Sequence, residues 1–136
     1  MKPAPLLVEG YAALFGAADL SGDVVRAGAF ARSLRAGAVP MLLQHRSGAI
    51  AGRWTRLVED GRGLFVRGLI EGGTASRAVA TGLSGLSIGF RVRLWKPRPE
   101  GGRDLIDIDL VEISLVASPM QPLARFVQIG GAAQAA

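Results

Sequence analysis

Three residues of this 136-residue chain carry side chains that together supply a base, a hydroxyl and an acid. His45, the only histidine, closes an apolar run, where a solvated loop histidine is not expected. Ser87 lies between two glycines in an apolar stretch, and Glu112 lies inside a β-rich stretch. A histidine, a hydroxyl and a carboxylate, each on a predicted strand, are the parts of the catalytic triad of a serine hydrolase.

The position of the acid, Glu112, can be predicted from the pattern of its strand, because side chains alternate between the two faces of a strand. On the predicted strand 103–116, one face carries Ile106, Ile108, Leu110, Glu112 and Ser114, and the other carries Leu105, Asp107, Asp109, Val111 and Ile113. Glu112 therefore falls on an apolar face, where a carboxylate is costly to bury unless it is paired, and a histidine is a suitable partner. A salt bridge to one of the sixteen Lys and Arg residues is the alternative. Asp107 and Asp109 are predicted to be exposed, so they are weaker candidates for the acid.

Ser87 differs from the other serines in its glycine neighbours. Gly85 and Gly89 remove side chains on either side, which leaves room for a peptide to approach the hydroxyl closely. Ser84 and Ser114 lack such a pair. A serine in a Gly-rich strand, or a lone histidine, is more often structural than catalytic, so the interpretation rests on the coincidence of all three residues.

The composition argues against several other chemistries. The absence of cysteine excludes a disulfide framework and a thiol nucleophile, and a single histidine argues against an ordinary zinc site. A chain with 49% hydrophobic and 20% charged residues is expected to form one domain with a real core. The sequence has no apolar run near the roughly 20 residues of a membrane span and no signal-peptide plan at its start, so we expect a cytoplasmic protein without a membrane segment.

The net charge of +5 raises the question of nucleic-acid binding. One group of basic residues is dense enough to form a patch, namely Arg91, Arg93, Lys96, Arg98 and Arg103. It lacks a helix-turn-helix signature and an aromatic-studded sheet motif, so specific nucleic-acid binding is not expected. A solvated hairpin, or a surface that steers the protein toward an acidic partner, accounts better for this charge.

The periodicity along the chain is mostly that of strands. Strands are predicted over residues 6–15, 41–45, 50–58, 64–70 and 103–116 and around Ser87, with short helices over 27–35 and 74–81 and a hairpin turn at 59–63. About seven short strands with two short helices predict a mainly β (α+β) domain that forms a small barrel, because crossover helices do not alternate regularly with the strands. We expect this domain over residues 1–128, followed by a flexible tail over 129–136.

Several motifs occur together over about residues 8–125. They are the acidic turn Asp19–Val25, Gly28–Phe30, Gln44–His45, Glu59–Leu64, Gly85–Phe90, and Glu112–Val116 followed by Ser118–Pro119. In this order they resemble the prohead (capsid maturation) serine proteases of tailed phages, a family related to the herpesvirus assemblins. Arg46 departs from the pattern of this family, in which an acidic residue often follows the histidine. The resemblance implies a partly open β-barrel like that of the herpesvirus proteases.

The resemblance also implies an activity. The implied activity is that of a serine endopeptidase, which cleaves a scaffold protein or the major capsid protein precursor. Cleavage would take place inside the procapsid in the bacterial host, during assembly of a phage, prophage or gene-transfer particle. Ser87 would be the nucleophile, His45 the base and Glu112 the residue that orients it, without a cofactor and in a homodimer. Two alternatives stay open: a non-catalytic capsid-assembly or scaffold-associated protein, and a basic nucleic-acid-binding barrel.

Overall fold

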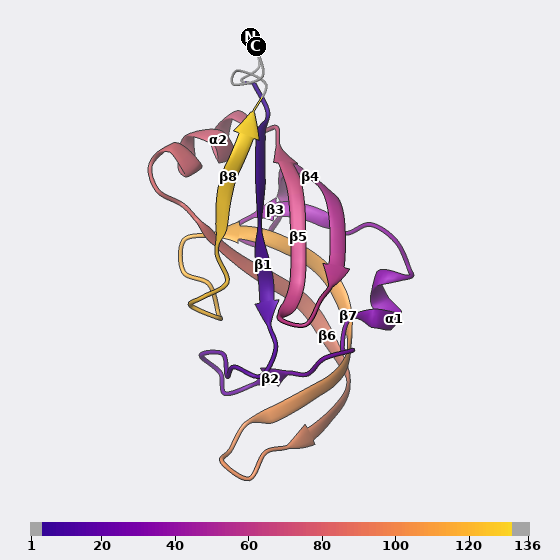
Figure 1. The fold of residues 1–136 in the computed structure, drawn as a ribbon. Helices are drawn as coiled ribbons and strands as arrows, with labels where there is room; N and C mark the ends of the chain where they lie inside the picture. The colour runs from indigo at the N-terminus through magenta and orange to yellow at the C-terminus, as the bar shows by residue number, and fades with distance from the viewer. Residues whose placement is uncertain (1–3, 132–136) are drawn as a thin grey trace.

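The computed structural model describes residues 4–131, which form one mixed sheet and two short helices (Figure 1). The strands are β1 (Leu6–Leu14), β2 (Val24–Val25), β3 (Pro40–Leu43), β4 (Arg46–Glu59), β5 (Gly63–Ile70), β6 (Gly85–Pro97), β7 (Arg103–Val116) and β8 (Phe126–Gly131). The helices are α1 (Ala31–Leu34) and α2 (Gly73–Ala80). The prediction of a mainly β domain with short helices is confirmed, with eight strands instead of about seven.

The sheet runs in the order β2-β7-β3-β4-β5-β1-β8, and β6 pairs with β7 outside this path. β6 and β7 form a long antiparallel hairpin, which projects at the lower end of Figure 1. Near the start of β6, backbone hydrogen bonds join the chain to the segment before β8: the Leu86 N–H donates to the Ala124 carbonyl and the Phe126 N–H to the Ser84 carbonyl. These bonds link the start of β6 to the start of β8, so the sheet curves into a partly open barrel, as expected.

The core lies inside this curved sheet and follows the two-residue period of the strands. In β5, Leu64, Val66 and Ile70 are fully buried, whereas Phe65 and Arg67 between them are partly exposed. The other large side chains that are fully buried come from both halves of the chain and include Phe30, Met41, Leu86, Leu105, Ile108, Ile113 and Leu115. Burial of each such side chain contributes about 1.5–3 kcal/mol, so the hydrophobic pattern is the main determinant of the barrel.

The first predicted helix is shorter than expected. Residues 27–35 were expected to be helical, but α1 begins only at Ala31. Gly28 has a φ of +92°, which a helix does not accommodate. The Gly28 and Phe30 N–H groups donate instead to the two carboxylate oxygens of Glu59, at 3.2 and 2.7 Å.

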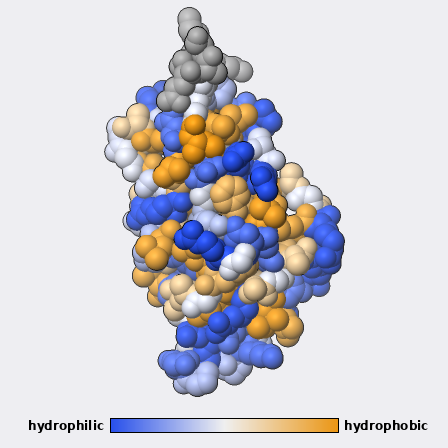
Figure 2. All heavy atoms as spheres, viewed as in Figure 1, coloured by the Kyte–Doolittle hydropathy of each residue, from blue (hydrophilic) through white to orange (hydrophobic). Residues whose placement is uncertain are grey.

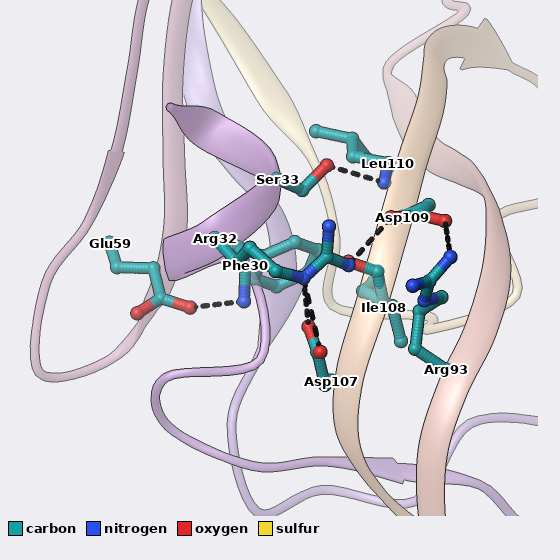
Figure 3. Close-up of polar contacts among 9 residues, drawn as sticks. All are labelled: Phe30, Arg32, Ser33, Glu59, Arg93, Asp107, Ile108, Asp109 and Leu110. Atoms are coloured by element: carbon teal, nitrogen blue, oxygen red, sulfur yellow. Dashed lines mark hydrogen bonds and ion pairs between the residues drawn. The ribbon is translucent and has the colours of Figure 1, made fainter. Parts of the chain in front are cut away.

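Polar contacts attach α1 to β7 (Figure 3). The Ser33 hydroxyl accepts a hydrogen bond of 2.8 Å from the Leu110 N–H. The Arg32 guanidinium pairs with Asp107 at 3.1 Å and with Asp109 at 2.6 Å, and it holds the pKa of the Asp109 carboxyl below its usual range. The helix is therefore fixed beside the part of β7 that precedes Glu112.

The second predicted helix is present as α2, shifted by one residue. Its N-cap residue is Gly72 in an extended conformation, so Thr74 does not cap it. The Thr74 hydroxyl accepts a hydrogen bond from Arg77 instead. No helix within residues 4–131 has the length and the hydropathy needed to cross a membrane.

Two boundary and register predictions need correction. Strand β8 continues through Gly131, and Gly130 and Gly131 pair with Leu7 and Leu6, so pairing does not stop at residue 128. Backbone pairing needs no side-chain bulk, so the small residues of this segment did not indicate that the strand continues. Residues 132–136 of the expected tail lie outside the described residues.

Leu105, expected on the more exposed face of β7, is fully buried because the register with β6 shifts twice in this region.

A buried ion pair joins the turn before β2 to the start of β7. The Arg103 guanidinium donates to both carboxylate oxygens of Asp23, at 3.0 and 2.7 Å, and Asp23 is only 7% exposed. These hydrogen bonds hold the pKa of the Asp23 carboxyl below its usual range, against the opposing effect of burial. The pair is charge-assisted and bidentate, which is the strong geometry for such contacts.

We expect Arg103→Met to lower the free energy of unfolding by about 1–2 kcal/mol at about pH 7, because it leaves a buried carboxylate without its donor. A depressed folded-state pKa stabilises the fold above the unfolded-state value and loses this effect as the pH falls through the folded-state value. The difference between parent and variant should therefore shrink as the pH falls below the ordinary carboxyl pKa and through the lower folded-state value. Urea denaturation at neutral pH and over a series of acidic pH values measures it.

Arg56→Met is the matched control, because Arg56 is exposed and forms no ion pair with any residue from 4 to 131. A pH-independent loss of stability in Arg103→Met, or an equal loss in the control, would contradict this account of the Asp23 pair.

Candidate active site

His45 lies at the tip of a tight hairpin. β3 ends at Leu43 and β4 begins at Arg46, so Gln44 and His45 form a two-residue connection. Their φ angles are 54° and 61°, in the left-handed region that residues other than glycine rarely adopt. Positive φ at both positions is typical of the type I′ turn, which matches the twist of paired strands. The prediction that His45 lies on a strand is therefore wrong.

The hairpin tip is held by the last part of β7. The Gln44 N–H donates to the Leu115 carbonyl at 2.9 Å, and the Gln44 side-chain oxygen accepts from the Ala117 N–H at 3.2 Å. The His45 N–H donates to the Ser114 hydroxyl at 3.2 Å. These contacts keep the unusual backbone beside the strand that carries Glu112.

The imidazole of His45 contacts the carboxylate of Glu112. Their Nδ1 and Oε1 atoms are 2.5 Å apart, and the Glu112 side chain is 9% exposed whereas that of His45 is 46% exposed. An ionised carboxylate can only accept a hydrogen bond, so a neutral His45 that bonds to it carries its proton on Nδ1 and has Nε2 as an acceptor. The pairing of a buried Glu112 with His45, expected from the sequence, is observed, and within residues 4–131 no Lys or Arg forms a salt bridge with Glu112.

Ser87 is placed by the pairing of β6 with β7. Ser87 lies opposite Ser114, and Gly89 lies opposite Glu112. Residues two apart share a face of a strand, so the Ser87 side chain is on the same face as Glu112. Ser87 is 8% exposed, and its hydroxyl makes no hydrogen bond to any residue from 4 to 131, but it lines one pocket together with His45. Catalytic hydrogen bonds are often long in enzymes without substrate and tighten in the complex.

The pocket has a volume of about 170 Å³ and lies between β6, β1 and the loops at residues 19–23 and 120–121. Besides Ser87 and His45, it is lined by Ala12, Asp19, Ser21, Asp23, Val25, Leu86, Ile88, Phe90, Met120 and Gln121. The acidic turn of the sequence motif thus forms one wall of the pocket. Asp23 is paired there with Arg103, and the pocket presents apolar side chains together with polar ones that include the Asp19 carboxylate.

The glycines beside Ser87 have a different role from the one predicted. A Cβ atom on Gly89 would lie 2.6 Å from Glu112 Oε1, so Gly89 makes room for the acid and not for a peptide. A Cβ atom on Gly85 would lie 2.6 Å from the Val116 carbonyl oxygen and 2.8 Å from the Pro119 ring. Both glycines are required by close packing of β6 on β7.

The weaker candidates lie elsewhere or act differently. Asp107 and Asp109 are bound by Arg32, and the Ser84 hydroxyl accepts a hydrogen bond from Arg125. Ser114, which sequence reasoning set aside, contacts both the His45 backbone and the second oxygen of Glu112. Its position two residues after Glu112, on the same face of the strand, is the signal that could have identified it.

Three of the five residues of the basic patch on the β6–β7 hairpin form ion pairs. Arg93 lies 3.4 Å from Asp109, Arg98 lies 3.7 Å from Asp104, and Arg103 binds Asp23. The lower end of the molecule, where the hairpin projects, is mainly hydrophilic (Figure 2). These pairs reduce the free positive charge that binding to nucleic acid or to an acidic partner would use.

Solved structures with a similar fold are viral proteases. KSHV protease, in complex with a hexapeptide phosphonate inhibitor, matches with a TM-score of 0.63 and 16% identity, over 92% of this chain and 64% of that one. Varicella-zoster virus protease matches with a TM-score of 0.50 and 20% identity, over 74% of this chain and 57% of that one. At these identities the similarity establishes the fold, which is the herpesvirus-protease-like barrel expected from the sequence.

Sequence comparison identifies the family. The prohead protease of Enterobacteria phage HK97 is 34% identical over 95 residues, which are 63% of this chain and 42% of that protein. This chain thus spans less than half the length of that curated relative. The model of a family described as caudovirus prohead serine protease matches residues 4–130, nearly all of the chain. The chain therefore belongs to the caudovirus prohead serine protease family.

Proposed function

We propose that this protein is a serine endopeptidase in which Ser87, His45 and Glu112 are the catalytic residues. The observation that carries the proposal is the 2.5 Å contact between His45 Nδ1 and Glu112 Oε1, at a pocket that His45 shares with Ser87. A base held by a buried carboxylate and placed beside a serine hydroxyl is the arrangement that activates a serine. Membership of a serine protease family supports the same chemistry.

In the proposed reaction, Ser87 Oγ attacks the scissile carbonyl carbon and His45 Nε2 takes the hydroxyl proton. The imidazolium that forms is stabilised by Glu112 through Nδ1, and it gives its proton to the leaving amine. Water then hydrolyses the acyl-enzyme by the same steps, with His45 as the base. Backbone N–H groups around the pocket would stabilise the oxyanion.

The proposed substrates are segments of a scaffold protein or of the major capsid protein precursor, cleaved inside the procapsid in the host. The support is the family and the HK97 relative, whose name is prohead protease. A non-catalytic assembly protein would keep this fold, but it would have no need for a histidine held at a strained hairpin tip beside a serine. The nucleic-acid alternative rested on the positive charge of the patch, which the ion pairs of Arg93, Arg98 and Arg103 offset in part.

We further propose that the active form is a homodimer, on the basis of the family resemblance. Analytical ultracentrifugation should then detect a monomer–dimer equilibrium, and specific activity should rise with protein concentration over the same range. Specific activity that is constant across that range, with a monomer throughout, would contradict the proposal.

Loss of the nucleophile or of the base should remove most of the activity. Ser87→Ala and His45→Ala should each lower turnover on the order of 10⁶-fold, and the double variant should be hardly slower, because the residues act as a unit. Cleavage of purified capsid precursor, followed by gel electrophoresis and mass spectrometry, measures this.

Ser84→Ala is the matched control, since Ser84 lies three residues earlier and its hydroxyl contacts Arg125. It should cleave at the parent rate. Cleavage at the parent rate by Ser87→Ala would show that another residue is the nucleophile, and additive losses in the double variant would show that Ser87 and His45 do not act together.

Gly89→Ala tests the placement of the acid without changing any of the three residues. The new methyl group would overlap with Glu112 Oε1 at 2.6 Å and displace the carboxylate from His45. We expect kcat to fall on the order of 10–100-fold, as for loss of a supporting partner in other sites. Gly61→Ala, where a Cβ atom meets nothing within 4 Å, should keep the parent kcat. Equal kcat in Gly89→Ala and Gly61→Ala would contradict the proposed role of Glu112.

A further inference from the structure

The Ser114 hydroxyl connects the two residues that form the base–acid pair. It accepts a hydrogen bond of 3.2 Å from the His45 backbone N–H and donates one of 2.5 Å to Glu112 Oε2. Ser114 is fully buried, and it is not among the residues that line the pocket. A direct contact with a substrate is therefore excluded, and any effect of Ser114 on catalysis must pass through His45 or Glu112.

Both partners of Ser114 need support. The backbone of His45 is in the left-handed region, which costs about 1–2 kcal/mol per residue relative to an ordinary conformation. Its imidazole is 46% exposed and is held by Glu112 alone among the side chains from residues 4 to 131. Glu112 in turn uses one oxygen for His45, so its orientation depends on what binds the other oxygen.

Ser114 meets both needs with a single hydroxyl. A serine hydroxyl has one proton to donate and lone pairs to accept, and here the proton goes to Glu112 while a lone pair takes the His45 N–H. Removal of the hydroxyl would leave a buried carboxylate oxygen and a backbone N–H without these partners. Such groups shift to find new partners, because an unsatisfied buried polar group is costly.

We propose that Ser114 is a positioning residue that fixes the hairpin tip and the Glu112 carboxylate at once, so that His45 and Glu112 keep one arrangement. The inference rests on the proposed serine protease function for its effect on activity. The arrangement itself exists in the resting protein, so it is also measurable without a substrate.

The first measurement is the far-downfield proton resonance of a hydrogen-bonded imidazole Nδ1–H in the NMR spectrum of the full chain. His45 is the only histidine, so the resonance is assigned without ambiguity. We expect it in the parent, and we expect it to be lost or strongly broadened in Ser114→Ala, where the carboxylate is free to turn. An unchanged resonance in Ser114→Ala, or none in the parent, would overturn the proposal whether or not the protein cleaves.

Ser33→Ala is the matched control. The Ser33 hydroxyl also accepts a backbone N–H of β7, that of Leu110, but it contacts neither His45 nor Glu112. Ser33→Ala should lose stability and keep the downfield resonance. Loss of the resonance in both variants would mean that it follows general stability and would overturn a specific role of Ser114.

The second measurement is kinetic. Ser114→Ala should lower kcat on the order of 10–100-fold and leave KM within about twofold of the parent value, because a buried positioning residue does not touch substrate. In a double-mutant cycle with Glu112→Gln, the two losses should be far from additive. A rise in KM with unchanged kcat, or additive losses, would overturn the proposal. If even the parent fails to cleave, the proposed function fails, and the NMR result alone decides the role of Ser114.

Ser114→Cys covers the case in which Ser114→Ala does not fold. The cysteine side chain fills the space and keeps a weak donor, so this variant should fold. Its kcat should lie between those of the parent and of an inactive variant, and its downfield resonance should be weakened. A parent-like kcat together with a parent-like resonance in Ser114→Cys would rule out the hydroxyl as the group that matters.

Discussion

Strand β7 is bonded on both sides, and the site depends on this double pairing. Along one side, β6 brings Ser87 opposite Ser114, and along the other, β3 pairs in parallel at Ile113–Leu115 and delivers the chain to His45. The pairing of backbones therefore brings residues that are distant in the sequence toward Glu112. The partly open barrel matters to function because it fixes these two registers, and a slip of one residue in either would turn a required side chain to the opposite face.

The tip of the β3–β4 hairpin illustrates a balance between strain and support. Two left-handed residues cost roughly 2–4 kcal/mol together. Gln44 and His45 make three contacts with β7 and one with Ala117, which follows it, and at about 1 kcal/mol each these contacts offset this cost. The imidazole thus projects from a short, rigid turn whose conformation depends on the neighbouring strand. A base on a longer loop would lack this coupling between the fold and the orientation of the ring.

The sequence allowed the strand pattern and the burial of Glu112 to be predicted, because both follow from a two-residue period that the local sequence carries. It did not allow the turn at His45 to be predicted, since Gln-His lacks the glycine or asparagine typical of such turns and is stabilised by contacts with residues distant in the sequence, in β7 and at Ala117. The role of Gly89 depends on which residue lies across the strand pair, which is a property of register and not of sequence. For Ser114, the two-residue spacing from Glu112 was visible, but the His45 N–H that it binds was not.

The central claim is that Ser87 is a nucleophile activated by His45, which Glu112 orients. Its most direct test is treatment of the folded protein with a fluorophosphonate, followed by intact-mass measurement and peptide mapping. The account predicts a single adduct, located on Ser87 in the parent and absent from His45→Ala. An adduct on another serine, equal labelling of the two proteins, or no adduct on a folded parent would contradict it.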